Sequence, residues 1–261
     1  DSKSLNIAGD ITFSGEIIDL ETLKALPPDS TDSGLLASIR SQSLDTDPLY
    51  GIFTSGSTGT PKGVVVGHRS VIDFIGHFTD MFHITSQDVI GNQAPFDFDV
   101  SVKDIYSTLK TGATMEIIPK RLFSIPTGLL DYLCQKQITT AIWAVSALCI
   151  ITTLNGFTYR VPTHLDKILF SGEVMPEKHL RAWRTHLPEA VFVNLYCTTE
   201  ITCNCTYHIL HPDRDYPQGI PIGKPFPNER VFLLDQGDRV ITTPGAVGEI
   251  CVGGTALALG Y

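Results

Sequence analysis

The chain has 261 residues, of which 43% are hydrophobic and 18% charged, and its formal net charge is −9. This length allows one large domain or two small ones. The acidic balance argues against nucleic acid or an anionic membrane as the main partner. The longest apolar run, 140–154, is too short and too broken by Ser and Thr to span a bilayer, and no signal peptide opens the sequence. The cysteines lack the spacing of a disulfide framework, so we expect a reduced, cytoplasmic protein.

The first 48 residues are the least informative. Residues 16–20 fit a short strand and 21–25 a short helix. Residues 26–48 are rich in Pro, Ser, Thr and Asp, and this composition predicts a loop or linker.

A loop of unusual composition follows at 54–63, with three glycines, five hydroxyl side chains and one lysine. Expected buried strands at 50–53 and 64–66 flank it. Glycines let backbone amides approach a polyphosphate, hydroxyls donate further hydrogen bonds, and Lys62 supplies positive charge. A P-loop of ordinary NTPases fits poorly, because Pro61 precedes the lysine and Gly63 follows it, where a helix should begin. The remaining alternative is a plain surface loop.

Strand and helix patterns alternate beyond this loop, which predicts a mostly parallel sheet covered on both faces. Expected helices are 69–82, 99–109, 129–135, a helix capped by Ser146 and ending at 154, and 177–185. Expected strands are 89–93, 114–118, 139–143, 165–170 and 191–195. After 210 a turn-rich connector at 219–225 and short strands at 231–234, 239–241 and 249–252 predict a small β-barrel or β-subdomain.

Three segments carry further polar groups. Asp99 follows a strand and opens a helix, so it is either an N-cap or a ligand group at the carboxyl edge of the sheet. Glu173 follows another strand, and the interpretation of this turn that involves no ligand puts Glu173 in the first turn of the next helix. Cys197, Cys203, Cys205 and His208 could be imagined as a zinc site. They lack a paired C-x-x-C, and Cys203 and Cys205 share one face of an expected strand, which favours a structural role.

The loop resembles the phosphate-binding signature of the acyl-adenylate-forming superfamily. Further segments resemble an amino-acid adenylation domain of the nonribosomal peptide synthetase type: Asn-Leu-Tyr-Cys-Thr-Thr-Glu at 194–200, Gly-Glu-Ile-Cys-Val-Gly-Gly at 248–254 and Gly-Tyr at 260–261. Stretches 93–96 and 104–106 look like D-alanine–carrier protein ligases. Ser171 replaces a family glycine, and Cys197-Thr198 replaces Gly-Pro, which puts the local backbone in doubt more than the chemistry.

The resemblance implies part of the larger N-terminal core of an adenylate-forming enzyme, with an α/β fold. Its expected divisions are 1–48, the end of a truncated first subdomain plus linker; 49–210, a central α/β subdomain with the ATP and substrate sites; and 211–261, the start of a β-subdomain. It covers residues from about 50 to 261. The family's ribose-binding aspartate and C-terminal lid with its lysine are absent, so we expect the isolated polypeptide not to complete adenylation.

The implied activity is ATP-dependent formation of aminoacyl-AMP, followed by loading of the amino acid onto the phosphopantetheine thiol of a carrier protein. Implied cofactors are ATP and Mg²⁺, the metal being held by Glu200. Lys62, Thr199 and Glu200 are the implied catalytic residues. Tyr196 would stack on adenine, and Asp99 would hold the α-ammonium of the substrate. The implied ATP-binding residues are Thr54, Ser55, Gly56, Ser57, Thr58, Gly59, Lys62, Gly172, Glu173, Asn194, Tyr196 and Thr199.

The implied substrate pocket leaves the amino acid open. Lys103 lies four residues after Asp99, so both can face one pocket. Alternatively, Lys103 pairs with Asp99 itself or points to solvent. An inward lysine would favour a polar or acidic substrate side chain, and otherwise a small neutral one is expected. The pocket positions carried over are Asp99, Val100, Lys103, Ile142, Leu169, Ser171, Leu195, Cys203 and Asn204.

Two other function classes remain open at this point. One is a catalytically silent scaffold that keeps the fold, which measured ATP binding would separate from an enzyme. The other is an acyl- or aryl-acid CoA ligase relative, whose substrate has no α-ammonium for Asp99.

Overall fold

The computed structural model describes Lys24 and residues 32–54, 60–196 and 198–261. The chain divides into two compact units, residues 1–44 and 45–261. In the first unit, helix α3 (Ser33–Gln42) begins where the Asp32 carboxylate accepts a hydrogen bond from the Leu35 amide at 3.0 Å. The linker predicted over 26–48 is therefore wrong for this stretch. None of the helix residues is buried, so this segment has no need of the apolar stripe by which a helix is recognised in a sequence. The elements expected at 16–25 lie outside the described residues, except for Lys24.

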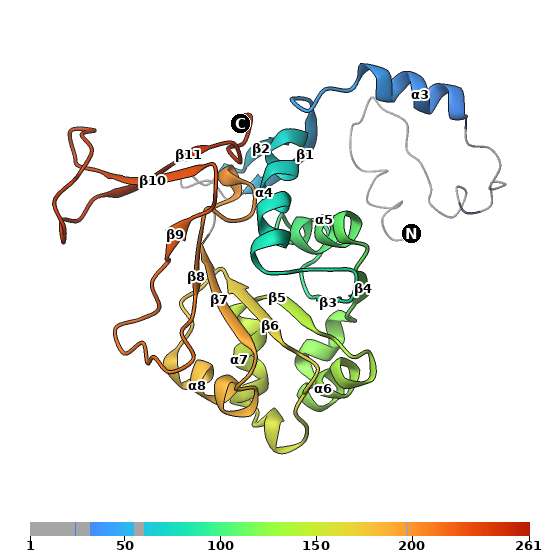
Figure 1. Cartoon of the computed structure of the whole chain (residues 1–261), viewed down its shortest axis with the longest axis vertical. Helices are drawn as coiled ribbons and strands as arrows, with labels where there is room; N and C mark the ends of the chain where they lie inside the picture. The colour runs from blue at the N-terminus through green and yellow to red at the C-terminus, as the bar shows by residue number, and fades with distance from the viewer. Residues whose placement is uncertain (1–23, 25–31, 55–59, 197) are drawn as a thin grey trace. The chain divides into compact units, whose positions relative to one another are not determined.

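A seven-stranded sheet forms the centre of the second unit, in the order β4-β3-β5-β6-β7-β8-β9 (Figure 1). The strands β3 to β7 run parallel to one another, whereas β8 and β9 pair antiparallel to their neighbours. This arrangement confirms the mostly parallel sheet predicted from the alternating pattern. The strands are β3 (Val89–Asn92), β4 (Thr114–Ile117), β5 (Thr140–Ala144), β6 (Lys167–Ser171), β7 (Val191–Tyr196), β8 (Thr206–Ile209) and β9 (Lys224–Pro225).

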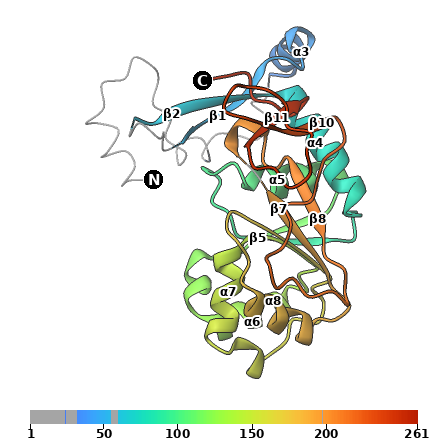
Figure 2. The same cartoon turned by 90° about the vertical axis from the view of Figure 1, so that its left-hand side faces the viewer.

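Helices cover both faces of this sheet (Figures 1 and 2). Trp143 and Phe170 belong to one apolar cluster with α6, α7 and α8, whereas Ile142 and Leu169 belong to the other, with α4 and α5. Neighbouring residues of a strand therefore enter opposite cores, as the two-residue period requires. The helices are α4 (His68–Met81), α5 (Ser101–Thr111), α6 (Pro126–Gln135), α7 (Val145–Thr153) and α8 (Glu177–His186), with short 3₁₀ turns η2 (Lys120–Ser124), η3 (Gly156–Thr158) and η4 (Thr199–Ile201).

Helix α4 holds the segment after β9 against the sheet. The ring of Phe226 lies 5.3 Å from that of Phe74 and 6.4 Å from that of Phe78, centroid to centroid, and Phe82 closes the group at 6.2 Å. The apolar spacing that predicted this helix thus produces an aromatic cluster, and an aromatic pair contributes about 0.5–1.5 kcal/mol beyond its area burial.

The two strands around the glycine-rich loop form a hairpin of their own. Strand β1 (Pro48–Thr54) pairs antiparallel with β2 (Lys62–Gly67), and Thr54 faces Lys62 at the loop end. β1 has no fully buried residue, so the expected buried strand is corrected to a partly exposed one. Val65 of β2 also forms an antiparallel bridge with Gly260, so residues near 260 lie beside this hairpin.

Two other expectations are corrected. Ser146 does not cap α7, because that helix begins directly after β5 with Ala144 as its N-cap residue. Of the predicted barrel or β-subdomain, the barrel is wrong: the described part of the chain forms a two-stranded antiparallel sheet of β10 (Glu229–Leu234) and β11 (Glu249–Gly254). The expected strand at 239–241 is reduced to a single bridge between Leu234 and Val240, because a tight turn built on Asp235 takes up the intervening residues. Of the helices in the described residues, none has the length and apolarity needed to cross a membrane.

Candidate functional site

A cavity of about 550 Å³ opens where the parallel strands end. Its walls come from the segments that follow β3, β5, β6 and β7, so it lies at the carboxyl edge of the sheet, where α/β folds place their ligands. The lining residues are Gln93, Ala94, Pro95, Asp97, Phe98, Asp99, Val100, Ala144, Ser171, Gly172, Thr198 and Thr199.

Asp99 is the buried acidic group of this cavity, with 5% of its surface exposed. Its backbone oxygen accepts from the Val102 amide and from the Cys203 thiol at 3.3 Å. Its carboxylate receives no hydrogen bond from any described residue. The N-cap alternative is wrong, because Val100 is the N-cap residue of α5 and no side chain caps that helix. A buried carboxylate that no described residue bonds is able to bind a cation.

A second cavity of about 280 Å³ lies beside the first, and Gly172 lines both. Gly172 has a φ of +93°, a left-handed conformation that glycine adopts without strain. Glu173 precedes α8, which begins at Glu177, so the expectation that it lies in the first helical turn is corrected. The full lining is Gly172, Glu173, Val174, Met175, Asn194, Leu195, Tyr196, Ile220 and Ile222. It thus brings together four of the residues expected at ATP, namely Gly172, Glu173, Asn194 and Tyr196.

Tyr261 lies beside both Lys62 and Glu200. The Tyr261 hydroxyl donates to Oε1 of Glu200 at 3.0 Å, and this hydrogen bond raises the pKa of the tyrosine. The Lys62 ammonium lies 5.1 Å from the centroid of the Tyr261 ring. Sequence reasoning gave Tyr261 only a structural role, although its match to a family motif marked it. The loop residues Ser55, Gly56, Ser57, Thr58 and Gly59 lie outside the described residues.

A buried polar cluster lies next to Asp99. Lys103 is fully buried, and its ammonium donates to Oδ1 of Asn204 at 2.8 Å. Both alternatives for this lysine are therefore wrong: it is not exposed, and its ammonium bonds Asn204 instead of pairing with Asp99 in the described part of the chain. Asp104 is also fully buried. It accepts from Nδ2 of Asn92 at 2.7 Å, and burial raises the pKa of its carboxyl to about 7. Asn92 and Asp104 were missed, because neither the strand pattern around Asn92 nor the helix pattern around Asp104 shows which polar residues face inward.

The other expected substrate residues lie at different depths. Ser171 and Val100 line the first cavity and Leu195 the second. Ile142, Leu169 and Cys203 lie in the apolar cluster between the sheet and α4. Cys203 and Cys205 precede β8 instead of lying in it, because Thr202 and Cys203 have positive φ angles that interrupt an extended strand. Among the described residues, no group of three His, Cys, Asp or Glu side chains could hold a metal ion.

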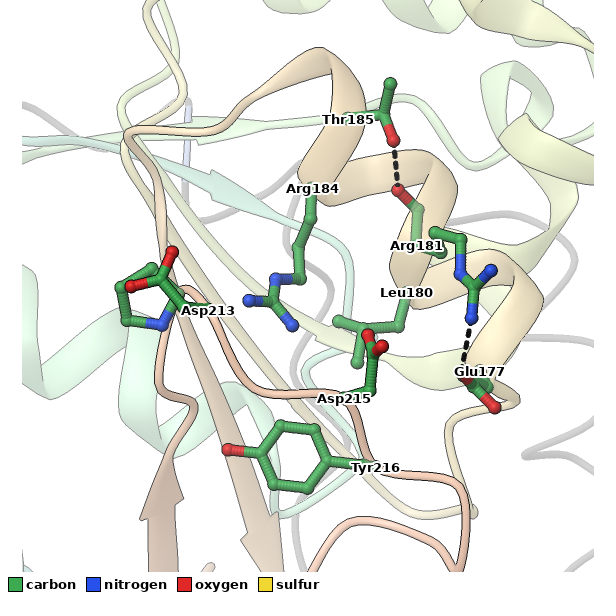
Figure 3. A pocket seen from close by; sticks show the side chains of 9 residues that line it. Glu177, Leu180, Arg181, Arg184, Thr185, Asp213, Asp215 and Tyr216 are labelled. Carbon is green, nitrogen blue, oxygen red and sulfur yellow. Dashed lines mark hydrogen bonds and ion pairs between the residues drawn. The ribbon is translucent and has the colours of Figure 1, made fainter.

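A third cavity, of about 260 Å³, lies between α8 and the 212–216 segment (Figure 3). The Arg184 guanidinium points into it and donates to the carbonyl oxygens of His211 and Arg214, while Arg181 pairs with Glu177 at 2.6 Å. No residue predicted for the functional site lines this cavity. Both of its arginines are already bonded to protein groups, so the first two cavities are the better candidate site.

Comparisons with known proteins identify the family of the chain. The family described as AMP-binding enzyme matches residues 11–261. The L-proline–[L-prolyl-carrier protein] ligase of Streptomyces coelicolor is 36% identical over 80% of this chain and 40% of that ligase. The D-alanine–D-alanyl carrier protein ligase of Bacillus cytotoxicus is 33% identical over 83% of this chain and 43% of that ligase. The chain thus spans about two fifths of the length of these relatives.

A solved structure of the nonribosomal peptide synthetase FmoA3, in a form bound to α-methyl-L-serine-AMP, is similar to the chain as well. The TM-score is 0.74 and the sequence identity 30%, over 83% of this chain and 24% of that one.

Proposed function

Because the chain belongs to the AMP-binding enzyme family, we propose that the whole protein activates an α-amino acid with ATP and passes it to a carrier protein. The membership confirms the resemblance to adenylation domains that the motifs indicated. In the proposed reaction a carboxylate oxygen of the amino acid attacks the α-phosphorus of ATP, and the bond from that phosphorus to the oxygen bridging to the β-phosphate breaks. Pyrophosphate leaves, and aminoacyl-AMP remains. The carrier thiol then attacks the acyl carbon, and AMP leaves.

The observation that supports this proposal most directly is the carboxylate of Asp99. It is buried, has no hydrogen-bond partner among the described residues and lines the larger cavity. The α-ammonium of an amino acid supplies the missing partner, and it does so with opposite charge. A substrate acid without an amino group would leave Asp99 without a cation, which speaks against an acyl- or aryl-acid CoA ligase.

The nucleotide is assigned to the smaller cavity and the groups around it. Tyr196 offers a ring face to the adenine, and the backbone at Gly172 and Glu173 forms a wall beside it. Thr199, which lines the larger cavity, would contact the α-phosphate. Lys62, at the end of the loop hairpin, neutralises the departing pyrophosphate. In this proposal the protein accelerates adenylation by neutralising charge and positioning the reactants, and it forms no covalent bond to them in this step.

Mg²⁺ fits the chemistry of Glu200. Among the described residues, the Tyr261 hydroxyl bonds Oε1 of that carboxylate and none bonds the second oxygen, which could therefore bind a hard cation. Magnesium is often bound by one or two carboxylates together with substrate phosphates. The lack of a larger acidic cluster in the described residues is compatible with that arrangement. The bound ion supplies charge neutralisation for the phosphates.

Removing either charge at the phosphate end should slow activation. We expect Lys62→Ala to lower kcat/KM for ATP, and Glu200→Gln to raise the Mg²⁺ concentration needed for half-maximal rate. Each change should correspond to a loss of about 1–3 kcal/mol in binding free energy. Steady-state pyrophosphate release by the full-length protein measures both. Lys178→Ala, which removes an exposed lysine from α8, is the control. Unchanged kinetics in both site variants would contradict the assignment.

The proposed product can be tested directly. Full-length protein incubated with ATP, Mg²⁺ and a mixture of α-amino acids should yield an aminoacyl-AMP detectable by mass spectrometry. A protein that binds no ATP analogue in calorimetry would instead be a scaffold with the fold of an adenylating enzyme.

A further inference from the structure

We infer that Tyr261 is a positioning residue of the nucleotide site, whose ring and hydroxyl hold the Lys62 ammonium and the Glu200 carboxylate apart until ATP and Mg²⁺ bind. The inference rests on the proposed function, because it concerns how the two charges assigned there to the phosphates and the metal stay available to them.

The backbone before Tyr261 joins the two elements that carry these charges. The amide of Val65 in β2 donates to the carbonyl oxygen of Gly260 at 2.9 Å, and the amide of Ala258 donates to the carbonyl oxygen of Glu200 in η4 at 2.9 Å. The segment is therefore attached on one side to the loop hairpin and on the other to the 3₁₀ turn. The residue that follows Gly260 is placed between them by these backbone contacts.

The side chain of Tyr261 meets the two charges with different parts. Its hydroxyl donates to Oε1 of Glu200 at 3.0 Å, and the Lys62 ammonium lies over its ring, 5.1 Å from the centroid. The face of an aromatic ring attracts a cation, and a phenol hydroxyl can donate to a carboxylate. One tyrosine thus stabilises a cation and an anion at once while its ring keeps them from direct contact.

Packing in the apolar core does not explain the place of this ring. Tyr261 is 72% exposed, and it belongs to neither apolar cluster of the described residues. Little apolar area is lost to water when such a ring is removed. Its contacts with Lys62 and Glu200 are therefore the main interactions that a substitution would remove.

Without the ring, the two charges should pair with each other. Opposite charges on neighbouring elements attract at contact distance. A direct pair of Lys62 with Glu200 would neutralise the ammonium that the phosphates need and occupy the carboxylate that the metal needs. That pair must break before either ligand binds. Because ion pairs near the surface are weak, we expect losses of about tenfold and not of thousands.

The test measures binding of a nonhydrolysable ATP analogue to the full-length protein by calorimetry, first without Mg²⁺ and then with it. Tyr261→Leu removes ring and hydroxyl, and it should weaken binding about tenfold in both conditions. Tyr261→Phe keeps the ring over Lys62, so it should bind the metal-free analogue within about twofold of wild type. It loses the donor to Glu200, and should need about three- to fivefold more Mg²⁺ for half-saturation.

Glu200→Gln supplies the measurement that a purely structural role of the tyrosine would not affect. In the wild-type background it removes an anion from the phosphate site, so metal-free binding should improve slightly. In the Tyr261→Leu background it also releases Lys62 from its pair, and the improvement should be larger by at least about fivefold. This difference between the two backgrounds reports the Lys62–Glu200 pair itself.

Tyr159 is the matched control, because it makes the same kinds of contact elsewhere. Its hydroxyl donates to Asp131 at 3.0 Å, the Arg160 guanidinium lies 5.8 Å from its ring centroid, and it lines neither cavity of the candidate site. Tyr159→Leu should leave binding of the analogue unchanged.

Three results would overturn the inference and leave the proposed function standing. They are wild-type binding by Tyr261→Leu, an equal loss in Tyr159→Leu, and the same gain from Glu200→Gln in both backgrounds. A wild-type protein that binds no ATP analogue would overturn the proposed function, and the inference with it.

Discussion

Asp99→Asn is expected to lower kcat/KM for the amino acid by about 2–4 kcal/mol, roughly 30- to 1,000-fold, with KM for ATP nearly unchanged. The substitution keeps the size of the side chain but removes the charge that pairs with the α-ammonium. The buried ammonium of the bound substrate then faces a neutral amide, and much of the loss is the penalty for a buried charge without its partner. Steady-state kinetics with varied amino acid at saturating ATP measures the effect.

The cavity offers its own control for this experiment. Asp97 lies two residues before Asp99 and lines the same cavity, but it is exposed to solvent. Asp97→Asn should change kcat/KM by less than about 1 kcal/mol, because exposed charges are screened by water. Equal losses in the two variants would show that Asp99 has no special role toward the ammonium.

Asp104→Asn should make the free energy of unfolding less dependent on pH. The Asp104 carboxyl has a pKa of about 7 in the folded protein against an ordinary value of 3.8, because burial disfavours its charged form. Between these values the native state binds more protons than the unfolded chain, so stability falls as pH rises from about 4 to about 7. A difference of about three pKa units corresponds to about 4 kcal/mol. The variant has no carboxyl at this position and does not lose stability in this way. Its free energy of unfolding should therefore exceed that of the wild type by a margin that grows toward about 2–4 kcal/mol at pH 8.

Urea unfolding of the full-length protein at pH 5 and pH 8 measures this effect. The amide can still accept the hydrogen bond from Asn92, so the two proteins should be of similar stability at the acidic end. The positive charge of the neighbouring Lys103 stabilises the ionised Asp104 carboxylate in the wild-type protein. The variant lacks this attraction, which reduces its stability advantage over the wild type. Parallel pH profiles for variant and wild type would show that Asp104 does not titrate in this range.

The parallel sheet was predictable because its signal is local. The central strands β5 and β6 are short apolar runs, and α4 repeats its apolar residues at helical spacing. Helix α3 was not predictable in this way, because none of its residues is buried and only Asp32 marks its start. The hairpin of β1 and β2 was predicted as two strands, but its separation from the main sheet depends on long-range pairing that short patterns do not contain.

The candidate site shows the same division. Asp99, Ser171 and Thr199 were placed by motifs that end strands, and they meet at one cavity because parallel strands end on the same edge. The orientation of Lys103 could not be settled from sequence, since its partner Asn204 lies far along the chain. Tyr261 joins Lys62 and Glu200 only because the C-terminal residues pair with β2. Contacts of this kind arise from the fold and not from the spacing of residues in one segment.

The most direct test of the proposed activity is ATP–pyrophosphate exchange by the full-length protein, with each α-amino acid compared with the analogue that lacks its α-amino group. The account predicts exchange that depends on an α-amino acid and on Mg²⁺, and that falls at least about 100-fold with the matching desamino acid, because Asp99 then has no cation to bind. Exchange supported equally by the desamino acid, or by no α-amino acid, would contradict it.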